Sequence, residues 1–399
     1  MSMETGVHYP LHLDALPKGW RAGYVGDFAK EIEPGFASGE HNQTGEGVAH
    51  LRPMNVDRDG KIDLSVTKFV SGSKDDRRLA VGDVLFNNTN SPDLVGKTAA
   101  VSVAGDFAFS NHMTRIRFAD DVLPKFGALQ LHFLWMRGYF KYNCVKHVNQ
   151  ASVSSRTLAR GVPFVWGPPA TQERIVAEIE RQFSRLDEAV ANLKRVKANA
   201  MHFGRATVEV LTSPGSFSTN VMGTVTDVAV SLDNMREPVN KTERAKRVGT
   251  IPYLGANGQT GWIDEARFDE ELVLVVEDET FVGRKQPFSY YFSGKCWVNN
   301  HTHVLRARRD LVLPKYLNLA LSYYPFIPLT TGSTGRRKLT KATLMSAPIR
   351  VPDLMTQQNI VAEVDRRLSI VREVEAEVDA NLKRAQALRQ AVLARAFAA

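Results

Sequence analysis

Three short segments of this sequence concentrate groups that can bind a nucleic acid. Thr330–Lys338 combines small hydroxyl residues with two glycines and three cations. Hydroxyl groups and glycine amides can donate to phosphates, and arginine can also hold a guanine edge through two hydrogen bonds. Asn87–Ser91 and Asn257–Thr260 are rich in amides, and such side chains can pair with adenine in the same way. Each segment taken alone is more typical of a polar surface turn.

The positive charges favour the same kind of partner. No Asp or Glu occurs from Val122 to Gln172 or from Leu311 to Pro352, and each stretch holds six lysines and arginines. A polyanion suits such stretches, because each neutralised phosphate releases a condensed counterion. The whole chain has 51 Lys and Arg against 43 Asp and Glu, a surplus of 8 that favours an acidic polymer or a membrane surface. The location of the charges is more informative than their sum.

The motifs of catalytic and cofactor sites are missing or incomplete. Gly96-Lys97-Thr98 ends like a nucleotide-binding loop, but Ser91 stands where that motif needs its first glycine. His301 and His303 could bind a metal, yet a strand with two outward histidines explains them better, since no Cys or carboxylate cluster completes the site. We find no dinucleotide fingerprint, no Asn/Asp-Pro-Pro-aromatic motif and no nucleophile elbow. The sequence predicts no catalytic residue, no metal site and no cofactor in this chain.

Composition indicates a folded protein of two or three domains. The chain has 399 residues, and its 43% of apolar residues excludes disorder as a description of the whole. Cys144 and Cys296 are the only cysteines, which favours a reducing compartment. No signal peptide is visible, and the apolar run at Leu272–Val276 is short enough for a strand. We expect a soluble, cytoplasmic protein.

An internal repeat organises the chain. Thr171–Arg181 returns as Thr356–Arg366 after 185 positions, and Asn192–Arg195 returns as Asn381–Arg384 after 189 positions. A tandem four-residue repeat at Glu373–Ala380 accounts for the difference. Two more pairs of segments match: Val122–Phe126 with Val312–Tyr316, and Asn111-His112 with Asn300-His301. The chain therefore consists of two copies of one unit, and the acid-free stretches occupy the same place in both.

Each copy ends in a predicted long helix, at 170–203 and at 355–399. Apolar residues recur every three or four positions, and glycine and proline are absent from both interiors. In the second helix, apolar residues also recur every seven positions from Val364 to Val392, the spacing of a coiled-coil seam. We expect the two helices to pair, although each could instead pack only on its own globular segment. The residues expected at this interface are Ile175, Ile179, Leu186, Leu193, Ile360, Val364, Val371, Val378 and Leu382.

The two globular segments, 1–169 and 204–354, read as strand-rich with turn signals and one short apolar helix each. The fold class is therefore α+β, repeated twice, with one helical arm in each copy. The order of the strands does not follow from these patterns.

At this point the sequence resembles the specificity subunit of a type I restriction–modification system. The duplicated layout of globular segment and helix carries most of the likeness, which covers nearly the whole chain. The stretches that resemble the family are Leu16–Trp20, Phe86–Lys97, Gln172-Glu173, Ile251–Gly258, Thr331–Thr334, Gln357-Gln358 and Leu388–Phe397.

The resemblance implies an architecture and a set of partners. Residues 1–169 and 204–354 would be two target recognition domains, and the helices at 170–203 and 355–399 would form an antiparallel coiled coil that separates them. Each domain would read one half of a bipartite double-stranded DNA target, with half-sites about one turn, roughly 10 base pairs, apart. The helices would dock two methyltransferase subunits, and two restriction subunits would join that core. The chain would be cytoplasmic and DNA-associated, with no membrane partner.

The resemblance also places the chemistry elsewhere. S-adenosylmethionine would belong to the methyltransferase subunits, which methylate adenine, and ATP and magnesium would belong to the restriction subunits. This chain would be a non-catalytic subunit. Its first domain departs from the second at one loop, where Asn149–Ser154 stands in the place assigned to Thr331–Arg336.

We predict DNA-binding residues in both domains. In the first domain they are Lys68, Asn87, Asn88, Thr89, Asn90, Ser91, Lys97 and Arg156. In the second domain they are Tyr253, Asn257, Gln259, Thr260, Arg284, Lys285, Ser333, Thr334, Arg336, Arg337 and Lys338.

Two other kinds of function stay open from the residues alone. A single-chain enzyme that modifies or cleaves DNA through an unrecognised motif would act on DNA by itself. A coiled-coil scaffold that binds only proteins would leave the two basic stretches unexplained, and a nucleic-acid filter assay would identify it. The target sequence and the length of its spacer are not encoded in any pattern that we can read.

Overall fold

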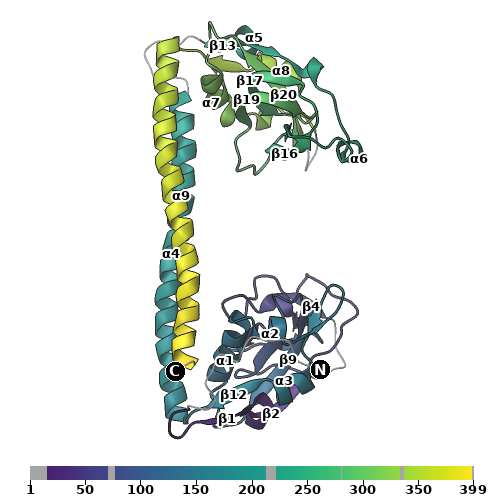
Figure 1. The fold of residues 1–399 in the computed structure, drawn as a ribbon, viewed down its shortest axis with the longest axis vertical. Coiled ribbons are helices and arrows are strands. Elements are labelled where there is room, and N and C mark those ends of the chain that lie inside the picture. The colour runs from purple at the N-terminus through teal and green to yellow at the C-terminus, as the bar shows by residue number, and fades with distance from the viewer. Residues whose placement is uncertain (1–15, 71–76, 213–221, 280, 333–336, 398–399) are drawn as a thin grey trace. The chain divides into compact units, whose positions relative to one another are not determined.

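The computed structural model describes residues 16–70, 77–212, 222–279, 281–332 and 337–397 (Figure 1). The chain divides into two compact units. Unit 1 comprises residues 1–192 and 381–399, and unit 2 comprises residues 193–380. Both mix helices and strands, as the sequence predicts. Among the helices of the described ranges, none combines the length and the apolar character needed to cross a membrane.

Unit 1 is built on short strands with helices packed against them (Figure 1). Its four sheets have the orders β2-β9-β5-β7, β4-β3-β8, β10-β11-β6 and β1-β12. The elements are β1 (Arg21–Tyr24), η2 (Val25–Phe28), β2 (Ala29–Pro34), β3 (Val48–Leu51), η3 (Pro53–Asn55), β4 (Lys68–Val70), β5 (Val84–Asn87), β6 (Thr89–Asn90), β7 (Thr98–Ala100), β8 (Phe107–Phe109), β9 (Met113–Phe118), α1 (Pro124–Met136), α2 (Tyr139–Tyr142), β10 (Val145–Lys146), β11 (Ala151–Ser152), α3 (Ser155–Gly161) and β12 (Pro163–Trp166).

Unit 2 repeats this plan with longer strands. Its main sheet has the order β14-β20-β17-β19-β15-β16, beside the pairs β13-β22 and β18-β21. The elements are β13 (Met222–Thr224), α5 (Val225–Val228), β14 (Ala229–Ser231), η4 (Asp233–Met235), α6 (Lys241–Arg244), β15 (Ile251–Gly255), β16 (Gly258–Ile263), β17 (Phe268–Val276), β18 (Asp278–Glu279), β19 (Ser289–Val298), β20 (Thr302–Ala307), α7 (Pro314–Ser322), η5 (Ile327–Leu329), β21 (Arg337–Lys338), α8 (Lys341–Ser346) and β22 (Pro348–Arg350).

Two 44-residue helices, α4 (Pro169–Thr212) and α9 (Leu354–Phe397), each contribute one segment to each unit. The first extends nine residues beyond the predicted end at 203, so that boundary was wrong. Gly204, the first residue after the predicted helix, lies inside α4. A Cβ atom there would lie 3.2 Å from a methyl group of Leu368, so glycine lets the two helices approach closely.

Within each unit the two helices run antiparallel. In unit 2, Lys197 of α4 pairs with Asp379 of α9 at 2.6 Å. In unit 1, Arg389 of α9 is buried, pairs with Asp187 of α4 and lies over the ring of Phe183. The seven-residue series in α9 is buried at Val364, Val371, Val378 and Ala385 and partly buried at Val392. The remaining residues predicted at the helix interface are buried at Ile179 and Ile360 and partly buried at Ile175, Leu186, Leu193 and Leu382.

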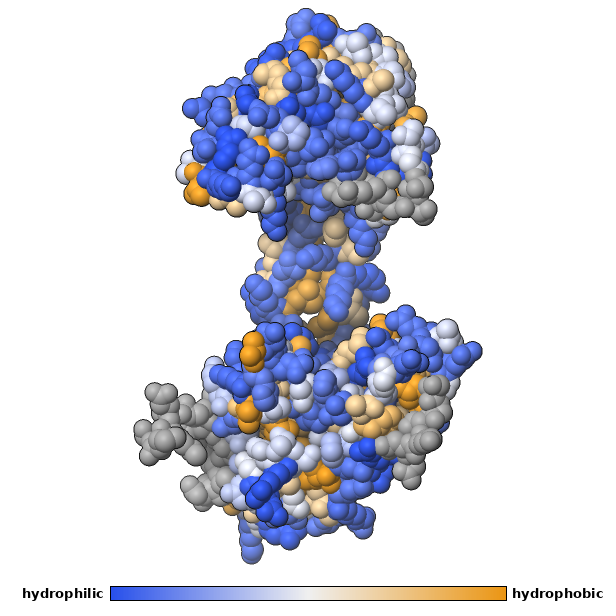
Figure 2. Space-filling view, turned by 90° about the vertical axis from the view of Figure 1, so that its right-hand side faces the viewer, coloured by the Kyte–Doolittle hydropathy of each residue, from blue (hydrophilic) through white to orange (hydrophobic). Residues whose placement is uncertain are grey.

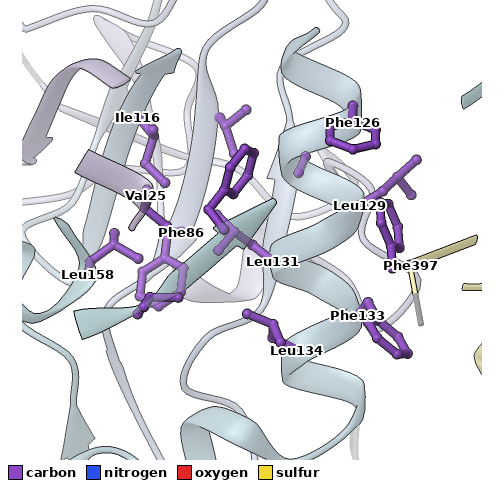
Figure 3. Packing of buried hydrophobic residues seen from close by; sticks show 14 of the residues in the cluster. Val25, Phe86, Ile116, Phe126, Leu129, Leu131, Phe133, Leu134, Leu158 and Phe397 are labelled. Carbon is purple, nitrogen blue, oxygen red and sulfur yellow. The ribbon is translucent and has the colours of Figure 1, made fainter. Parts of the chain in front are cut away.

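The helices also complete the core of each unit. In unit 1, Phe397 of α9 packs against Phe126 and Phe133 of α1, with ring centres 5.3 and 6.1 Å apart. Figure 3 shows Phe397 beside α1, at the edge of the cluster that also holds Phe86 and Ile116. In unit 2, Val208 of α4 and residues such as Val364 of α9 join the core that α7 covers. Pairing between helices and packing on the globular segments therefore occur together.

The duplication is visible in individual hydrogen bonds. Gln172 of α4 accepts from the backbone N–H of Leu123 at 2.8 Å and donates to the carbonyls of Asp121 and Gly167. Gln357 of α9 accepts from Leu313 at 2.8 Å and donates to the carbonyls of Leu311 and Pro352. Both glutamines are fully buried. Each fastens the start of a long helix to the loop that precedes α1 or α7.

We predict that Phe397→Ala destabilises unit 1 by about 3–5 kcal/mol, because it removes a buried ring and leaves a cavity. Calorimetric unfolding of the full chain measures the loss. Leu388→Ala is the matched control, since Leu388 lies on the same segment of α9 but is 53% exposed. Equal effects of the two substitutions would contradict a contribution of α9 to the core.

Unit 1 should also lose stability in mild acid. Burial, above all, lowers the pKa of His132 on α1 to about 4, and Gly60 packs directly on its ring. The unfolded chain binds this proton near pH 6.5, so stability is complete above that pH and falls as the pH decreases toward 4. The expected loss is on the order of 3 kcal/mol. His132→Leu should make the pH dependence of unfolding shallower without abolishing it, because burial also lowers the pKa of His50 in unit 1 to about 4. His147→Gln, at an exposed histidine, should leave the profile unchanged. An equally steep profile in His132→Leu would refute the assignment.

Candidate nucleic-acid interface

The same turn stands at the same place in both units. In unit 1 it is Asn111-His112, which follows β8 where β8 runs parallel to β3. Ser110 donates its backbone N–H to the carbonyl of Leu51 at 2.9 Å and accepts from the N–H of His112. We call this segment and its counterpart, Asn300-His301, the Asn-His turns.

The counterpart in unit 2 is held by matching bonds. It follows β19 where β19 runs parallel to β15. Asn299 donates its backbone N–H to the carbonyl of Leu254 at 2.9 Å, and its side chain accepts from the N–H of His301. A parallel strand pair thus fixes each turn, and one short polar side chain closes it.

A second segment crosses each Asn-His turn. Asn88 donates its backbone N–H to the carbonyl of His112, and Glu277 donates to that of His301, both at 3.0 Å. The strand pairs that follow also match, because β6 pairs with β11 and β18 pairs with β21. Positions 88 and 89 of unit 1 therefore correspond to Glu277 and Asp278 of unit 2.

This register corrects the alignment of the loops made from sequence. Val153 donates its backbone N–H to the carbonyl of Asn88, and Leu339 donates to that of Glu277. Ala151–Ser152 therefore corresponds to Arg337–Lys338, whereas the sequence analysis matched 149–154 with 331–336. The connections that lead to the two strands differ in length, so spacing along the chain did not reveal the register. The predicted segments Asn87–Ser91 of unit 1 and Arg337–Lys338 of unit 2 therefore lie on the two strands of the same kind of pair, β6 with β11 in unit 1 and β18 with β21 in unit 2.

In unit 1 a pocket of about 520 Å³ opens beside the Asn-His turn. Two predicted residues, Asn90 and Lys97, line it together with Arg52, which the sequence analysis did not select. Lys68 of β4 is close enough for its charge to act on His41, which contacts Arg52. The lining residues are Ala37, Ser38, Arg52, Pro53, Met54, Asn90, Leu94, Lys97, Ser110, Asn111 and His112.

Burial, hydrogen bonds and neighbouring charges act on Lys97 in this pocket and on His41 beside it. Lys97 is 6% exposed and donates to the carbonyls of Pro53 and Val56. Burial lowers the pKa of Lys97, with Asp57 opposing this and Arg58 adding to it. Burial also lowers the pKa of His41, and the charges of Arg52 and Lys68 lower it further.

Other predicted residues of unit 1 have structural contacts. Asn87 and Asn88 are buried; Asn87 donates to the carbonyl of Leu94, and Asn88 donates to that of Asn111 and to the hydroxyl of Thr114. These amides shape the turn, and a base contact would require those bonds to break. Thr89 donates its hydroxyl to the side-chain oxygen of Asn88, and the carbonyl of Ser91 accepts from the backbone N–H of Leu94. Arg156 is exposed on α3, outside the lining of the pocket.

In unit 2 the structure brings two predicted segments together. Arg284 donates to the Oδ1 atom of Asn257 at 2.8 Å and to the carbonyl of Pro287. Asn257 is exposed in the tight turn between β15 and β16, and Gly258, with a φ of 101°, completes that turn. Gln259, Thr260 and Lys285 are exposed around this pair, whereas Tyr253 is buried with its hydroxyl bonded to the carbonyl of Val239.

The basic segment of unit 2 is partly neutralised. Arg337 donates to the hydroxyl and the carbonyl of Thr330 at 2.6 and 2.8 Å. Lys338 pairs with Glu277 at 3.1 Å. The other predicted residues of this segment, Ser333, Thr334 and Arg336, lie outside the described residues.

The two histidines of unit 2 differ from the expectation. His301 pairs with Asp278 and is partly exposed, but His303 is only 2% exposed, so the prediction of an outward side chain was wrong for it. Strand β20 lies between β14 and β17 in its sheet, and His303 is covered by Asp233 and by the carbonyl of Leu339, which both hydrogen-bond to its ring. The second histidine therefore belongs to the interior.

Asp233, Glu277 and His303 form the one group of possible metal ligands found among the described residues, with donor atoms within 4.8 Å of one another. Arg236 contacts both carboxylates, at 3.4 and 2.6 Å. Burial alone would raise the pKa values of Asp233 and Glu277, but hydrogen bonds and charges from His303 and Arg236 outweigh it and lower both. The donors serve an internal ion-pair network, which does not fit a metal centre.

The surface of each unit that Figure 2 shows is predominantly hydrophilic. Apolar residues occur in small groups within it. Trp262 of β16 is 55% exposed.

Comparison with known proteins gives consistent results. Residues 218–380 match the family model described as type I restriction modification DNA specificity domain. A putative type I restriction enzyme specificity subunit of Haemophilus influenzae is 34% identical over 148 residues, which cover 37% of this chain and 37% of that protein. The putative MjaX specificity subunit of Methanocaldococcus jannaschii is 22% identical over 397 residues, 91% of each chain.

Two solved structures share the fold. A chain from a structure that describes complex assembly and conformational transition of the type I R-M system has a TM-score of 0.74 at 19% identity, over 96% of this chain and 99% of that one. The HsdS subunit of Thermoanaerobacter tengcongensis has a TM-score of 0.53 at 20% identity, over 98% and 99%. Residues 218–380 therefore match the DNA specificity domain of this family, and the chain as a whole is similar to type I restriction–modification specificity subunits.

Proposed function

We propose that this chain is the DNA-recognition subunit of a type I restriction–modification complex, and that each unit reads one half of a bipartite target. One observation carries the proposal. The two Asn-His turns are held by matching backbone bonds, but the side chains around them differ, with Asn88 and Thr89 in unit 1 where unit 2 has Glu277 and Asp278. An equal scaffold with different side chains suits two domains that read different base sequences.

The exposed groups supply suitable chemistry for reading. In unit 2, Asn257, Gln259 and Lys285 project around a turn that Arg284 braces. Amides can pair with adenine and cations with guanine in the major groove. In unit 1, Asn90 lies at the pocket beside the Asn-His turn. Phosphate contacts would position each unit, and these side chains would select bases.

The two long helices are the proposed docking surface for the methyltransferase subunits. Several apolar side chains on them stay exposed by 46–53%. Exposed apolar groups on paired helices favour a protein partner. We expect two methyltransferase subunits, two restriction subunits and a cytoplasmic location, and we expect the helices to set the gap between half-sites. The side chains concerned are Val196, Phe203, Ile370 and Leu388.

We also propose that the chain performs no reaction itself. Its buried group of carboxylates and histidine is occupied by Arg236 and Lys338, which supports a structural role for that group. S-adenosylmethionine, ATP and magnesium would then be bound by the partner subunits. DNA cleavage by the isolated full-length chain in the presence of magnesium would contradict this part of the proposal.

Selection from a random duplex library tests the function directly. The full chain, purified with its methyltransferase partner, should recover a bipartite sequence and bind it at least about 1,000-fold more tightly than a scrambled duplex at about 150 mM salt. The physical reason is that base contacts add to a phosphate term common to both duplexes. Equal affinity for the two duplexes would refute the proposal.

A substitution in unit 2 should affect one half-site only. Gln259→Ala removes an exposed amide beside the turn of β15 and β16, and it should weaken binding by about 1–3 kcal/mol when the half-site read by unit 2 is intact. Changing that half-site should abolish the difference between the variant and the wild type. Gln358→Ala, an exposed glutamine at the start of α9, is the control. Loss of the same size on a scrambled duplex would instead assign Gln259 to the DNA backbone.

A further inference from the structure

The unit 1 pocket holds positive charge without an acid in its lining. Arg52 and Lys97 are its two cations, and the residues that line it include no Asp or Glu. The described ion pairs of the chain include neither of them. A cation in a pocket without a carboxylate partner attracts an anionic ligand.

Both cations have donor capacity left for a ligand. An ammonium group has three N–H donors, and Lys97 uses two of them on the carbonyls of Pro53 and Val56. The guanidinium of Arg52 has five N–H donors, and its contact with His41 involves only the Nη2 atom. These backbone and ring contacts hold the two groups in place without neutralising their charge.

The rest of the lining suits one nucleotide unit of a strand. The side-chain amides of Asn90 and Asn111 offer further hydrogen-bond donors, and Met54 and Leu94 provide an apolar wall. The volume of about 520 Å³ exceeds what a lone phosphate needs and leaves room for an attached sugar. Phosphate with an adjoining apolar group is the repeating chemistry of the DNA backbone.

Unit 2 differs at the equivalent positions. The residue after Leu51 is Arg52, whereas the residue after Leu254 is Gly255, and a Cβ atom at Gly255 would lie 2.9 Å from the Nδ2 atom of Asn299. Asp278 replaces Thr89 and pairs with His301. Unit 2 thus has the closely packed Gly255 where unit 1 has Arg52, and it has the carboxylate of Asp278 where unit 1 has Thr89.

We propose that the unit 1 pocket binds a phosphodiester group of the DNA through Arg52 and Lys97, and that the described part of unit 2 has no equivalent phosphate site. The inference rests on the proposed function. The two units would then bind DNA with unequal electrostatic contributions. Unit 1 would bind a backbone phosphate in its pocket, whereas unit 2 would contact DNA through its exposed side chains.

The test measures how affinity changes with salt for the full chain and its methyltransferase partner. Arg52→Gln removes one phosphate contact, so the slope of log affinity against log salt should become shallower by about 1. A fourfold rise in salt would then cost about three- to fourfold less affinity than in the wild type. Target and scrambled duplexes should weaken by the same factor, and Arg52→Lys should restore the slope because it keeps the charge.

Control variants separate this site from the total charge and from misfolding. Lys30→Gln removes a cation of unit 1 that pairs with Asp120, and it should leave the slope nearly unchanged. Lys97→Arg keeps the charge and should retain the slope, provided that calorimetry shows normal unfolding. An unchanged slope in Arg52→Gln would overturn the proposal, as would weakening confined to the target duplex, which would make Arg52 a base reader.

A free phosphate is the alternative source of the same chemistry. If inorganic phosphate stabilised the wild type but not Arg52→Gln against unfolding, while the slope for DNA stayed the same, the site would serve a free anion and the proposal would be wrong. Failure of the proposed function has a different signature, because the wild type itself would then not distinguish the bipartite duplex from the scrambled one.

Discussion

Each unit depends on burying residues from two distant parts of the chain. The core of unit 1 includes Phe183 of α4 and Phe397 of α9, and the core of unit 2 includes Val208 of α4 and Val364 of α9. Apolar burial is the dominant favourable term in folding, so unit 1 needs both of its segments, 1–192 and 381–399, and unit 2 needs both ends of its stretch 193–380. The buried glutamines at the starts of both helices add directional bonds to this packing. The globular parts and the long helices therefore share their hydrophobic cores, although the sequence pattern shows them as separate segments.

The duplicated scaffold leaves room for divergence at the polar sites. The backbone bonds around the Asn-His turns match between the units because parallel strand pairs impose them. The side chains do not share that constraint. Unit 1 places Thr114 beside Asn88, whereas unit 2 places His303 beside Glu277 and must supply Arg236 and Lys338 to balance the charge. A buried carboxylate without such partners would be costly, so the substitutions of unit 2 form a connected set.

Sequence reasoning found the site only in part. Asn90 and Lys97 line the pocket, and Asn257 and Arg284 meet although 27 positions separate them. Asn87, Asn88 and Tyr253 were selected for their residue types, and the structure buries them, because strand register decides which side chain of a polar segment faces inward. Arg52 had no signal in the sequence. It joins the lining of the pocket because β3 lies parallel to β8, so that Arg52 and Asn111 border the same pocket.

Sequence patterns were enough to establish the duplication, the two long helices, the mixed fold and the concentration of positive charge, because these features are periodic or compositional and need no knowledge of long-range contacts. The three-dimensional structure was needed for the register between the copies, the extension of α4 past Gly204, the burial of His303 and the residues that line the pocket. Each of those depends on which segments pair across large separations in the chain, and residue types alone do not encode that pairing.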